Sequence, residues 1–335
     1  MLNYKYEKFF TFLKDKNLLI LTHDLVDIDG LASCFSLKLF LNKIFNESKS
    51  SIYLSEISKP TKSFMKNFET KFPDFSFKYE QKVKLSEFNV CIILDANKVN
   101  QLSSNILDEF SKLELDYIYI DHHYIQEKNN KDSLSLLYEN YTSTSEIILE
   151  IFRIYKILIP YHFRYLIAAA ILTDTGYFKY ANNKSIKNVC KLLKNDINIQ
   201  DLLLILENEI DISEKIAMIK GLQRVKLIRE ENYLIGLTYV SSYGASVASA
   251  LIKNGFDIGV VYSKEKTEII VNIRARKKIC LTTNLHLGKI LEEISIKYYG
   301  NGGGHDGAAS LTCQTENKDV IDDIIRNIKK VLKGK

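Results

Sequence analysis

Three short apolar runs, each ending abruptly in acidic or imidazole side chains, constrain the fold of this 335-residue chain more than any other feature. The runs are NLLILTH (17–23), VCIILDA (90–96) and YIYIDHH (117–123), with helical patterns between them, as at 30–44 and 101–114. Strands that are apolar on both faces and alternate with helices are typical of a parallel sheet covered on two sides. The sequence therefore predicts an α/β fold with a parallel sheet in its first part.

The second part of the chain follows a different pattern. Residues 185–226 are predicted to be helical throughout, and later strands and helices are expected in a smaller α/β domain. The expected strands are YLIGLTYV, FDIGVVYS and TEIIVNIRA, and the expected helices lie at about 245–254, 285–299 and 316–333. A chain of this length suits two domains. We therefore predict a first domain over 1–184, a helical connector over 185–226 and a second domain over 227–335.

Composition limits the classes of protein to consider. The chain is 46% hydrophobic and 26% charged, which is ordinary for a globular protein, and it has no apolar run long enough to span a membrane. Five widely spaced cysteines, without CxxC spacing, argue against a disulfide framework and a zinc knuckle, so a cytoplasmic location is expected. The net charge of +5 is compatible with anionic substrates, but too small for a dedicated binder of long nucleic acids.

Acids and histidines follow the predicted strands at the point where each one ends. The carboxyl ends of parallel strands meet at one edge of a sheet, where ligands bind in such folds. A further acid ends an apolar helical segment, AAAILTD. The candidate site residues are His23, Asp27, Asp29, Asp95, Asp121, His122, His123 and Asp174.

These carboxylates require positive charge if they converge. Taken singly, each acid could be a solvated turn residue or a helix cap. Two carboxylates 4 Å apart repel by about 4 kcal/mol at an effective dielectric constant near 20, and the motifs contain no Lys or Arg. Two divalent cations would balance four carboxylates. Oxygen ligands with a minority of imidazoles favour manganese or magnesium over structural zinc, and paired ions of this kind hydrolyse phosphate esters.

The second domain contains a glycine-rich stretch, YYGNGGGHDGAAS (298–310). Consecutive glycines such as Gly303 and Gly304 allow backbone N–H groups to approach an anion, and His305 adds a donor. A flexible loop is the alternative interpretation. Upstream, Arg274 and Arg276 end a predicted strand, where either could bind phosphate or simply be solvated.

The motifs HDLVDIDGLAS, ILDAN, IDHH, TDTGYF and GGGHDGAAS resemble, in order and spacing, those of the DHH phosphoesterases that carry a DHH-associated C-terminal domain. The similarity spans residues 20–310 and is strongest to nano-RNases, phosphoadenosine-phosphate phosphatases and cyclic di-AMP phosphodiesterases. It implies a manganese-dependent phosphodiesterase, with magnesium as an alternative and an active site in the cleft between the domains. The expected substrates are short oligonucleotides or nucleotides.

The resemblance also implies roles for individual residues. One metal would be held by His23, Asp27 and Asp95, and Asp95 would bridge to the second. The other ligands of that second metal would be Asp29, His122 and Asp174. His123 would face the scissile phosphate or the leaving oxygen, and Asp121 would orient a histidine. The second phosphate of the substrate would be held by Arg274, Gly303, Gly304 and His305.

The chain departs from the family pattern in two places. Val26 stands where a proline is common, and Tyr124–Gln126 lack the proline or asparagine often found after the histidine pair. The STSE segment, Ser143–Glu146, matches a family segment near the site, although helix capping by Ser143 or Thr144 is the simpler account.

The leading hypothesis from the sequence is an exonuclease-like enzyme that degrades very short oligonucleotides to mononucleotides. Hydrolysis of a cyclic dinucleotide or of phosphoadenosine phosphate is the alternative within the same chemistry. A non-catalytic, replication-associated subunit and a tRNA-editing type of domain are alternatives of other classes, which the complete set of acids disfavours. The sequence leaves the oligomeric state open, a homodimer included.

Overall fold

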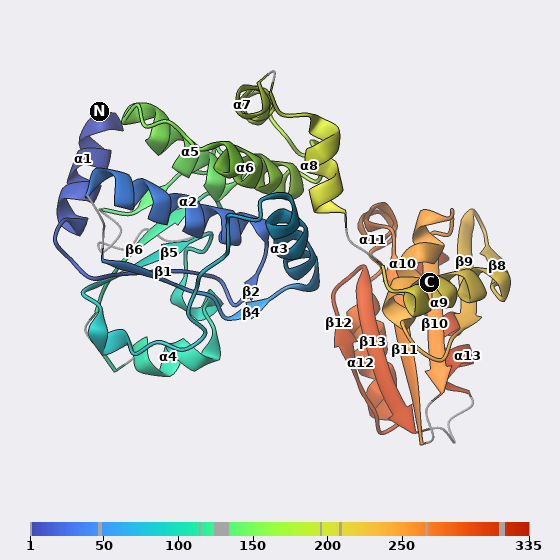
Figure 1. Cartoon of the computed structure of the whole chain (residues 1–335). Coiled ribbons are helices and arrows are strands. Elements are labelled where there is room, and N and C mark those ends of the chain that lie inside the picture. Colours follow the sequence, from blue (N-terminus) through green and yellow to red (C-terminus); the bar gives the residue numbers. More distant parts are fainter. Residues whose placement is uncertain are drawn as a thin grey trace. The chain divides into compact units, whose positions relative to one another are not determined.

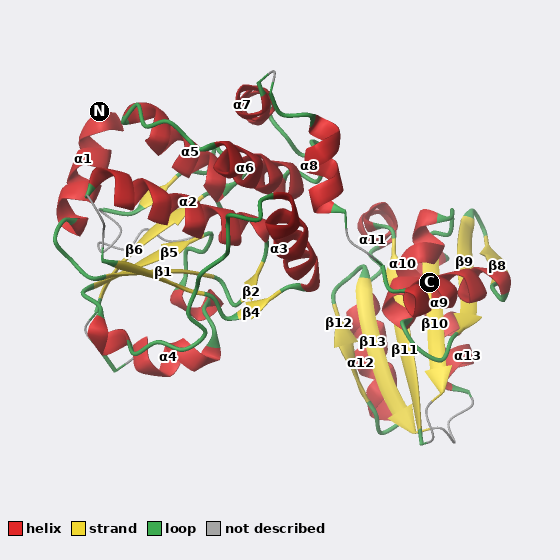
Figure 2. Cartoon of the chain, in the orientation of Figure 1, coloured by secondary structure: helices red, strands yellow, loops and turns green. Residues whose placement is uncertain are grey.

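Five parallel strands form the centre of the first unit of the structure, a computed structural model in which the residues described are 2–45, 49–110, 112–113, 115–123, 134–194, 196–207, 210–264, 267–314 and 319–334. The strand order is β3-β1-β5-β6-β7, and each pairing is parallel (Figures 1 and 2). The strands are β1 (Leu18–Thr22), β3 (Ser50–Tyr53), β5 (Val90–Leu94), β6 (Asp116–Asp121) and β7 (Leu136–Leu137). The parallel sheet predicted from the apolar runs is confirmed.

Helices cover both faces of this sheet. They are α1 (Leu2–Leu13), α2 (Ile28–Ile44), α3 (Lys59–Lys71), α4 (Ser104–Phe110), α5 (Thr144–Ile154), α6 (Tyr161–Asp174), α7 (Asn183–Leu193) and α8 (Ile199–Leu206). Alternate residues of β1 face different cores: Leu18 and Ile20 pack with α1, α2, α5 and α6, whereas Leu19 and Leu21 pack on the side of α4. Figure 1 shows α4 on that side, opposite α2, α5 and α6. This two-sided burial explains why the strands are apolar throughout.

Two short strands form a separate sheet next to the N-terminus of α2. They are β2 (Leu25–Val26) and β4 (Glu56–Ile57), which pair in parallel with Val26 opposite Ile57. Short 3-10 helices occur at Leu85–Glu87 and Val99–Gln101. Val26, the departure from the family pattern, is fully buried, and its carbonyl accepts a hydrogen bond of 3.0 Å from the backbone N–H of Ser58.

The second unit contains a six-stranded mixed sheet in the order β12-β13-β11-β10-β9-β8. Only β9 and β10 pair in parallel within it. The strands are β8 (Lys226–Glu230), β9 (Tyr233–Tyr239), β10 (Ile258–Lys264), β11 (Glu268–Ala275), β12 (Asn301–Gly304) and β13 (Ala308–Gln314). The helices are α9 (Ile212–Gln223), α10 (Gly244–Lys253), α11 (Lys277–Thr283), α12 (Leu287–Lys297) and α13 (Val320–Leu332). The buried residues of α12 and α13 share one core, and those of α9 and α10 share another.

The chain divides into two compact units, Met1–Glu209 and Ile210–Lys335. The boundary falls inside the range 185–226, in which α7, α8 and α9 are separate helices. The role of that range as a connector stays a prediction. In the described part of the chain, no helix combines the length and the apolar character needed to cross a membrane.

The glycine-rich stretch of the second unit is an edge strand, β12, rather than a loop. A Cβ atom on Gly288, at the start of α12, would lie 2.1 Å from the carbonyl oxygen of Gly304. A Cβ on Gly302 would lie 2.6 Å from the carbonyl oxygen of Leu291. The glycines therefore let a strand and a helix pack with their backbones in contact, a constraint that local composition does not reveal.

Candidate functional site

The first part of the site lies at the carboxyl end of β1 and the start of α2. His23 follows β1 directly, and Asp27 is the N-cap of α2, where its Oδ1 accepts a hydrogen bond of 2.9 Å from the N–H of Gly30. Asp29 lies in the first turn of α2 and is 1% exposed. A Cβ on Gly30 would lie 2.5 Å from Oγ1 of Thr22, so the glycine allows α2 to start close against the strand end.

Asp95 belongs to two of the three groups of described residues whose side chains could hold a metal, one with His23 and Asp27 and one with Asp121, His122 and His123. It follows β5, is 3% exposed, and has a backbone φ of 56°, a left-handed conformation that aspartate tolerates better than most residues. Its Oδ2 is 3.5 Å from Nε2 of His23, which is also 3.6 Å from Oδ1 of Asp27. Its Oδ1 is 3.4 Å from Nε2 of His122. The two oxygens of one carboxylate therefore face different imidazoles.

A further group contains Asp29, His122 and Asp174. Its ligand atoms lie within 4.8 Å of one another, as do those of His23, Asp27 and Asp95 in the first group. Nε2 of His122 is 3.2 Å from Oδ2 of Asp174, the last residue of α6. The structure thus brings together six residues that the sequence analysis assigns to metals, although their role as ligands stays a prediction.

The two adjacent histidines occupy different environments. His122 is 13% exposed and turns toward Asp95 and Asp174, whereas the side chain of His123 is 52% exposed. Nδ1 of His123 is 2.8 Å from Oδ1 of Asp121, which is fully buried at the end of β6. This contact fixes the His123 ring and leaves its Nε2 directed away from Asp121.

The N-terminus of α5 holds the buried Asp29 from the opposite side. The backbone N–H groups of Thr144 and Ser145 donate to Oδ2 and Oδ1 of Asp29, at 2.6 and 3.0 Å. The hydroxyl of Thr144 donates to Oδ1 of Asp95 at 3.1 Å. Helix N-terminal N–H groups stabilise negative charge, so α5 offsets part of the repulsion between these acids.

The start of α5 is itself anchored by a buried carboxylate. Ser143 caps the helix, as the sequence analysis considers, and accepts from the N–H of Glu146 at 3.3 Å. Glu146 is 1% exposed and accepts from the N–H of Thr142 at 2.9 Å and from Nδ2 of Asn188, in α7, at 2.6 Å. Local sequence predicts the cap, but the contact with Asp29 depends on a tertiary arrangement.

In the absence of a metal, neighbouring carboxylates raise the pKa values of two histidines of the site. Burial lowers the pKa of His23, but its hydrogen bonds to Asp27 and Asp95 outweigh this effect and raise it to about 10. Burial likewise lowers the pKa of His122, and the nearby Asp95 carboxylate raises it to about 9. Burial and the charge of Asp95 raise the pKa of Asp174 to about 7. A protonated imidazole would offset part of the negative charge of these acids.

The chemistry of these groups fits divalent cations. Nε2 of His122 and Oδ2 of Asp174 are buried and have no hydrogen-bond partner among the described residues. Within the same part of the chain, the ion pairs of these acids involve only histidines. Carboxylate oxygens with imidazole nitrogens and no thiolate are ligands suited to Mn²⁺ or Mg²⁺.

The second unit has a cavity of about 250 Å³ beside the glycine strand. It is lined by Ala245, Asn272, Ile273, Arg274, Gly303, Gly304, Ala308, Ala309 and Ser310. Arg274, Gly303 and Gly304, which are predicted from the sequence to bind an anion, all line this cavity. His305 follows β12 directly and is exposed, but it is not among the described residues that line the cavity.

Arg276 lies outside this cavity. The strand β11 ends at Ala275, and Arg276 begins the next helix, where its Nε donates to the carbonyl oxygen of Phe256 at 3.2 Å. Its Nε is also 3.8 Å from Oδ1 of Asp257. These contacts give Arg276 a structural role, whereas Arg274 has none of them.

A tight turn after Asp174 was not identified from the sequence. Gly176, Tyr177 and Phe178 have φ values of 56°, 56° and 70°, which is unusual for the two aromatic residues. The N–H of Tyr177 bonds to the carbonyl of Leu172 at 2.7 Å, and Phe178 packs against the core. Tyr177 is therefore held 54% exposed directly after a candidate ligand. The departure at Tyr124–Gln126 lies outside the described residues.

Comparisons with known proteins agree with this arrangement. Residues 17–174 match the model of the DHH family, N-terminal domain, and residues 244–334 match that of the DHHA1 domain. An uncharacterized protein of Methanocaldococcus jannaschii is 30% identical over 317 residues, which are 95% of this chain and 93% of that protein.

Solved structures share the fold at low sequence identity. An exopolyphosphatase-related protein from Bacteroides fragilis has a TM-score of 0.66 and 17% identity, covering 99% of this chain and 98% of that one. CDC45 from Entamoeba histolytica has a TM-score of 0.55 and 8% identity, covering 98% and 99%.

The parallel sheet, the acid and histidine cluster at its edge, and the separate second unit define a metal-dependent phosphoesterase. The chain belongs to the DHH family, with a DHHA1 domain as its second part.

Proposed function

We propose that this protein is a manganese-dependent phosphodiesterase that hydrolyses short oligonucleotides to nucleoside monophosphates. The observation that carries the proposal is the position of Asp95, whose two oxygens face two separate groups of candidate ligands. A carboxylate shared in this way is suited to two neighbouring cations. Paired divalent cations, when bound, stabilise charge on a phosphate and lower the pKa of an attacking water.

The candidate ligands divide between two ions. His23, Asp27 and Asp95 would hold the first, and Asp95 would be shared with the second. The remaining ligands of the second would be Asp29, His122 and Asp174. The N–H groups of Thr144 and Ser145 orient Asp29, so that its position is fixed before a cation enters.

His123 is the candidate for proton transfer. Its Nδ1 is held by the buried Asp121, and its side chain is half exposed, so that Nε2 would be the atom to meet an incoming substrate. From that atom it would donate a proton or a hydrogen bond to the leaving oxygen. Asp121 acts through His123 as a positioning residue, since it is fully buried.

The cavity of the second unit would bind another phosphate of the same substrate. Arg274 can form charge-assisted hydrogen bonds, and Gly303 and Gly304 leave the backbone accessible beside it. His305, one residue further along, would add a donor at the rim. A substrate with at least two phosphates, such as a dinucleotide with a terminal phosphate, would use both sites.

A substrate panel tests the proposal. The protein is incubated with manganese and a 5′-phosphorylated dinucleotide, a 30-mer, a cyclic dinucleotide or phosphoadenosine phosphate, and mononucleotide release is measured. We expect the dinucleotide to be hydrolysed fastest. Absence of mononucleotide from the dinucleotide and the 30-mer would refute the proposal, and faster hydrolysis of one of the other two would reassign the substrate.

Asp95→Ala is the matching loss-of-function variant. It removes the shared carboxylate, so we expect hydrolysis of every substrate to fall by more than about a thousandfold. Asp116→Ala is the control, because Asp116 is exposed at the other end of the same sheet. Unchanged activity in Asp95→Ala would contradict the assignment of the centre.

A further inference from the structure

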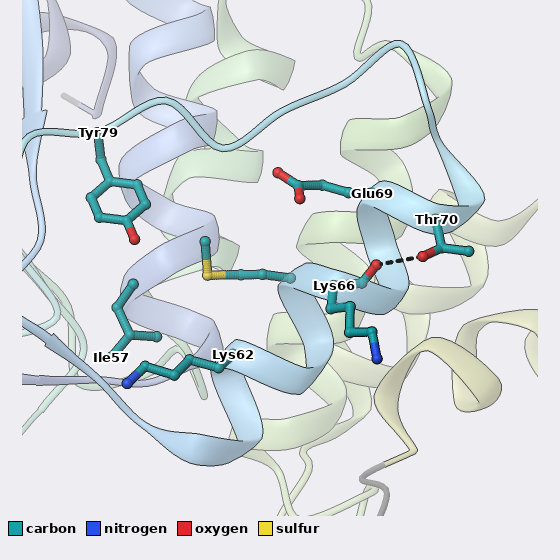
Figure 3. A pocket seen from close by; sticks show the side chains of 7 residues that line it. Ile57, Lys62, Lys66, Glu69, Thr70 and Tyr79 are labelled. Atoms are coloured by element: carbon teal, nitrogen blue, oxygen red, sulfur yellow. Dashed lines mark hydrogen bonds between the residues drawn. The ribbon is translucent and has the colours of Figure 1, made fainter.

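A cavity of the first unit lies along α3, and none of its lining residues belongs to the candidate metal centre. We call it the α3 pocket. Its volume is about 610 Å³, and it is lined by Ile57, Lys62, Lys66, Glu69, Thr70 and Tyr79, with Met65 as a further apolar member (Figure 3). Small-molecule sites have volumes of about 300–1,000 Å³, so a ligand of nucleotide size can fit.

The charged residues of the α3 pocket are ordered along the helix. Lys62 and Lys66 are four residues apart, and neither has an ion pair with another described residue. Like charges at this spacing repel, so nothing in the helix itself favours the pair. Glu69 lies in the next turn, and its Oε1 accepts the N–H of Phe77 at 2.9 Å, which fixes the carboxylate. Lys62 therefore supplies a cation at one end of the pocket, and Glu69 offers a fixed acceptor further along the helix.

An apolar wall faces these charges. Ile57 is 6% exposed, and Tyr79 packs against the phenylalanine-rich core of the first unit. Figure 3 shows the ring of Tyr79 opposite the helix, with its hydroxyl directed into the pocket, and the amino group of Lys62 reaching toward Ile57. The ring, Ile57 and Met65 present a surface suited to a flat, mainly apolar group.

The combination points to one class of ligand. An anionic group fits Lys62, while Lys66, whose amino group points the other way in Figure 3, adds positive charge further along the helix; a planar ring fits Tyr79, and an N–H donor fits Glu69. Lys62 and Glu69 are separated by about 10 Å along the helix axis, which is comparable with the length of one nucleotide. We propose that the α3 pocket binds a nucleoside phosphate whose base carries an exocyclic amino group.

The position of the pocket suggests two sources for such a ligand. Ile57 pairs with Val26, the residue before Asp27, so the pocket begins one strand away from the candidate metal centre. The nucleoside phosphate could be an additional nucleotide of a bound oligonucleotide, an interpretation that rests on the proposed function. It could equally be a free mononucleotide, which does not depend on that function.

Direct binding is measured first. The probes are AMP, CMP and UMP with metal-free full-length protein, in an Arg274→Ala background that disables the other phosphate cavity. We expect Lys62→Ala/Lys66→Ala to weaken AMP binding by about tenfold and to reduce its dependence on salt. The matched control is Lys187→Ala/Lys191→Ala, which removes two exposed lysines with the same spacing from α7.

Glu69→Gln tests how the base is recognised. Glutamine retains the oxygen that accepts the Phe77 N–H, so the fold is preserved, but its other group becomes a donor. We expect AMP and CMP to bind better than UMP in the parent protein and this preference to fall or reverse in the variant. Tyr79→Ala should weaken all three, whereas Tyr79→Phe should retain most of the affinity.

A comparison of hydrolysis rates for two substrates identifies the source of the ligand. The ratio of kcat/KM for a tetranucleotide to that for a dinucleotide is compared in the parent and in Lys62→Ala/Lys66→Ala. A ratio lowered by about tenfold assigns the pocket to an additional substrate nucleotide. An unchanged ratio with lost AMP binding assigns it to a free mononucleotide. If both the ratio and AMP binding equal those of the lysine control, the α3 pocket proposal is wrong, even where the dinucleotide is hydrolysed normally.

Discussion

The two units build their candidate binding sites from different parts of the chain. In the first unit the candidate site consists of side chains. Carboxylates and imidazoles from the ends of β1, β5, β6 and α6 and from the start of α2 meet at one edge of a parallel sheet. In the second, a strand of glycines exposes backbone beside a single arginine. One arrangement concentrates negative charge suited to cations, and the other offers donors suited to an anion. The comparison predicts that substitutions in the first unit affect the chemical step, and those in the second affect mainly substrate binding.

The largest contrast is expected within the first unit, between the adjacent histidines. His123→Ala should lower kcat by about a hundredfold or more while manganese stays bound, because the residue faces outward and contacts Asp121. His122→Ala should reduce metal occupancy, because its Nε2 lies between Asp95 and Asp174. Metal content after dialysis and single-turnover rates separate these effects. Equal metal loss in both variants would contradict the division of roles.

Arg274→Ala examines the second unit. We expect KM for a dinucleotide with a terminal phosphate to rise by about tenfold to a hundredfold, with little change in turnover of a simple model diester. Arg276→Ala is the control, because its side chain is bonded to Phe256 and lies outside the cavity. His305→Ala should resemble Arg274→Ala with a smaller effect. If Arg274→Ala lost activity equally on the dinucleotide and on the model diester, the assignment of substrate binding to the second unit would be contradicted.

Thr144→Val tests whether the hydrogen bond from α5 to Asp95 increases the affinity of the site for manganese. The variant loses the hydroxyl bond to Asp95 but keeps the N–H bond to Asp29. Loss of a partner that orients a ligand typically costs about tenfold or more in metal affinity, so we expect weaker manganese binding by calorimetry. Thr144→Ser retains the hydroxyl and should bind manganese as the parent does. Weakening in both variants would assign the effect to packing.

The smallest effect is expected in the stability of the second unit. Lys333 and Lys329, each 3.0 Å from Glu230, hold the pKa of this carboxyl below its usual value. A depressed pKa in the folded state stabilises it above the unfolded pKa, and this contribution is lost as pH falls through the folded pKa. Glu230→Gln should therefore lower the Tm slightly at neutral pH and not in strong acid. A pH-independent difference would contradict the ion-pair explanation.

The sequence predicts the first site better than the second for a physical reason. Asp95, Asp121 and His122 end apolar strands, and parallel strands bring their carboxyl ends to one edge, so order along the chain implies proximity. The turn at Tyr177 and the bond from α5 to Asp29 depend on packing between distant segments, which periodicity does not encode.

Glycine composition is ambiguous in the same way. The stretch before His305 is consistent with a loop, and only its packing against α12 selects the edge strand β12. Arg276 is a case in which the local pattern misleads. If the strand continued, its alternation would place Arg276 on the same face as Arg274, but β11 ends at Ala275, one residue before Arg276. The α3 pocket has no sequence signature, since it combines one helix with Ile57 and Tyr79 from neighbouring segments.

The bond between α5 and Asp29 also bears on the order in which the protein folds. Its partners, Asp29 and Thr144, are 115 residues apart in the chain, so closing this contact carries a larger entropic cost than forming α2 or α5 alone. A chain with its helices formed but α5 undocked would present an unrestrained Asp29 and a weaker affinity for cations. Capture of the metals should therefore coincide with the last steps of folding of the first unit, and retention of metal would report that its tertiary structure is complete.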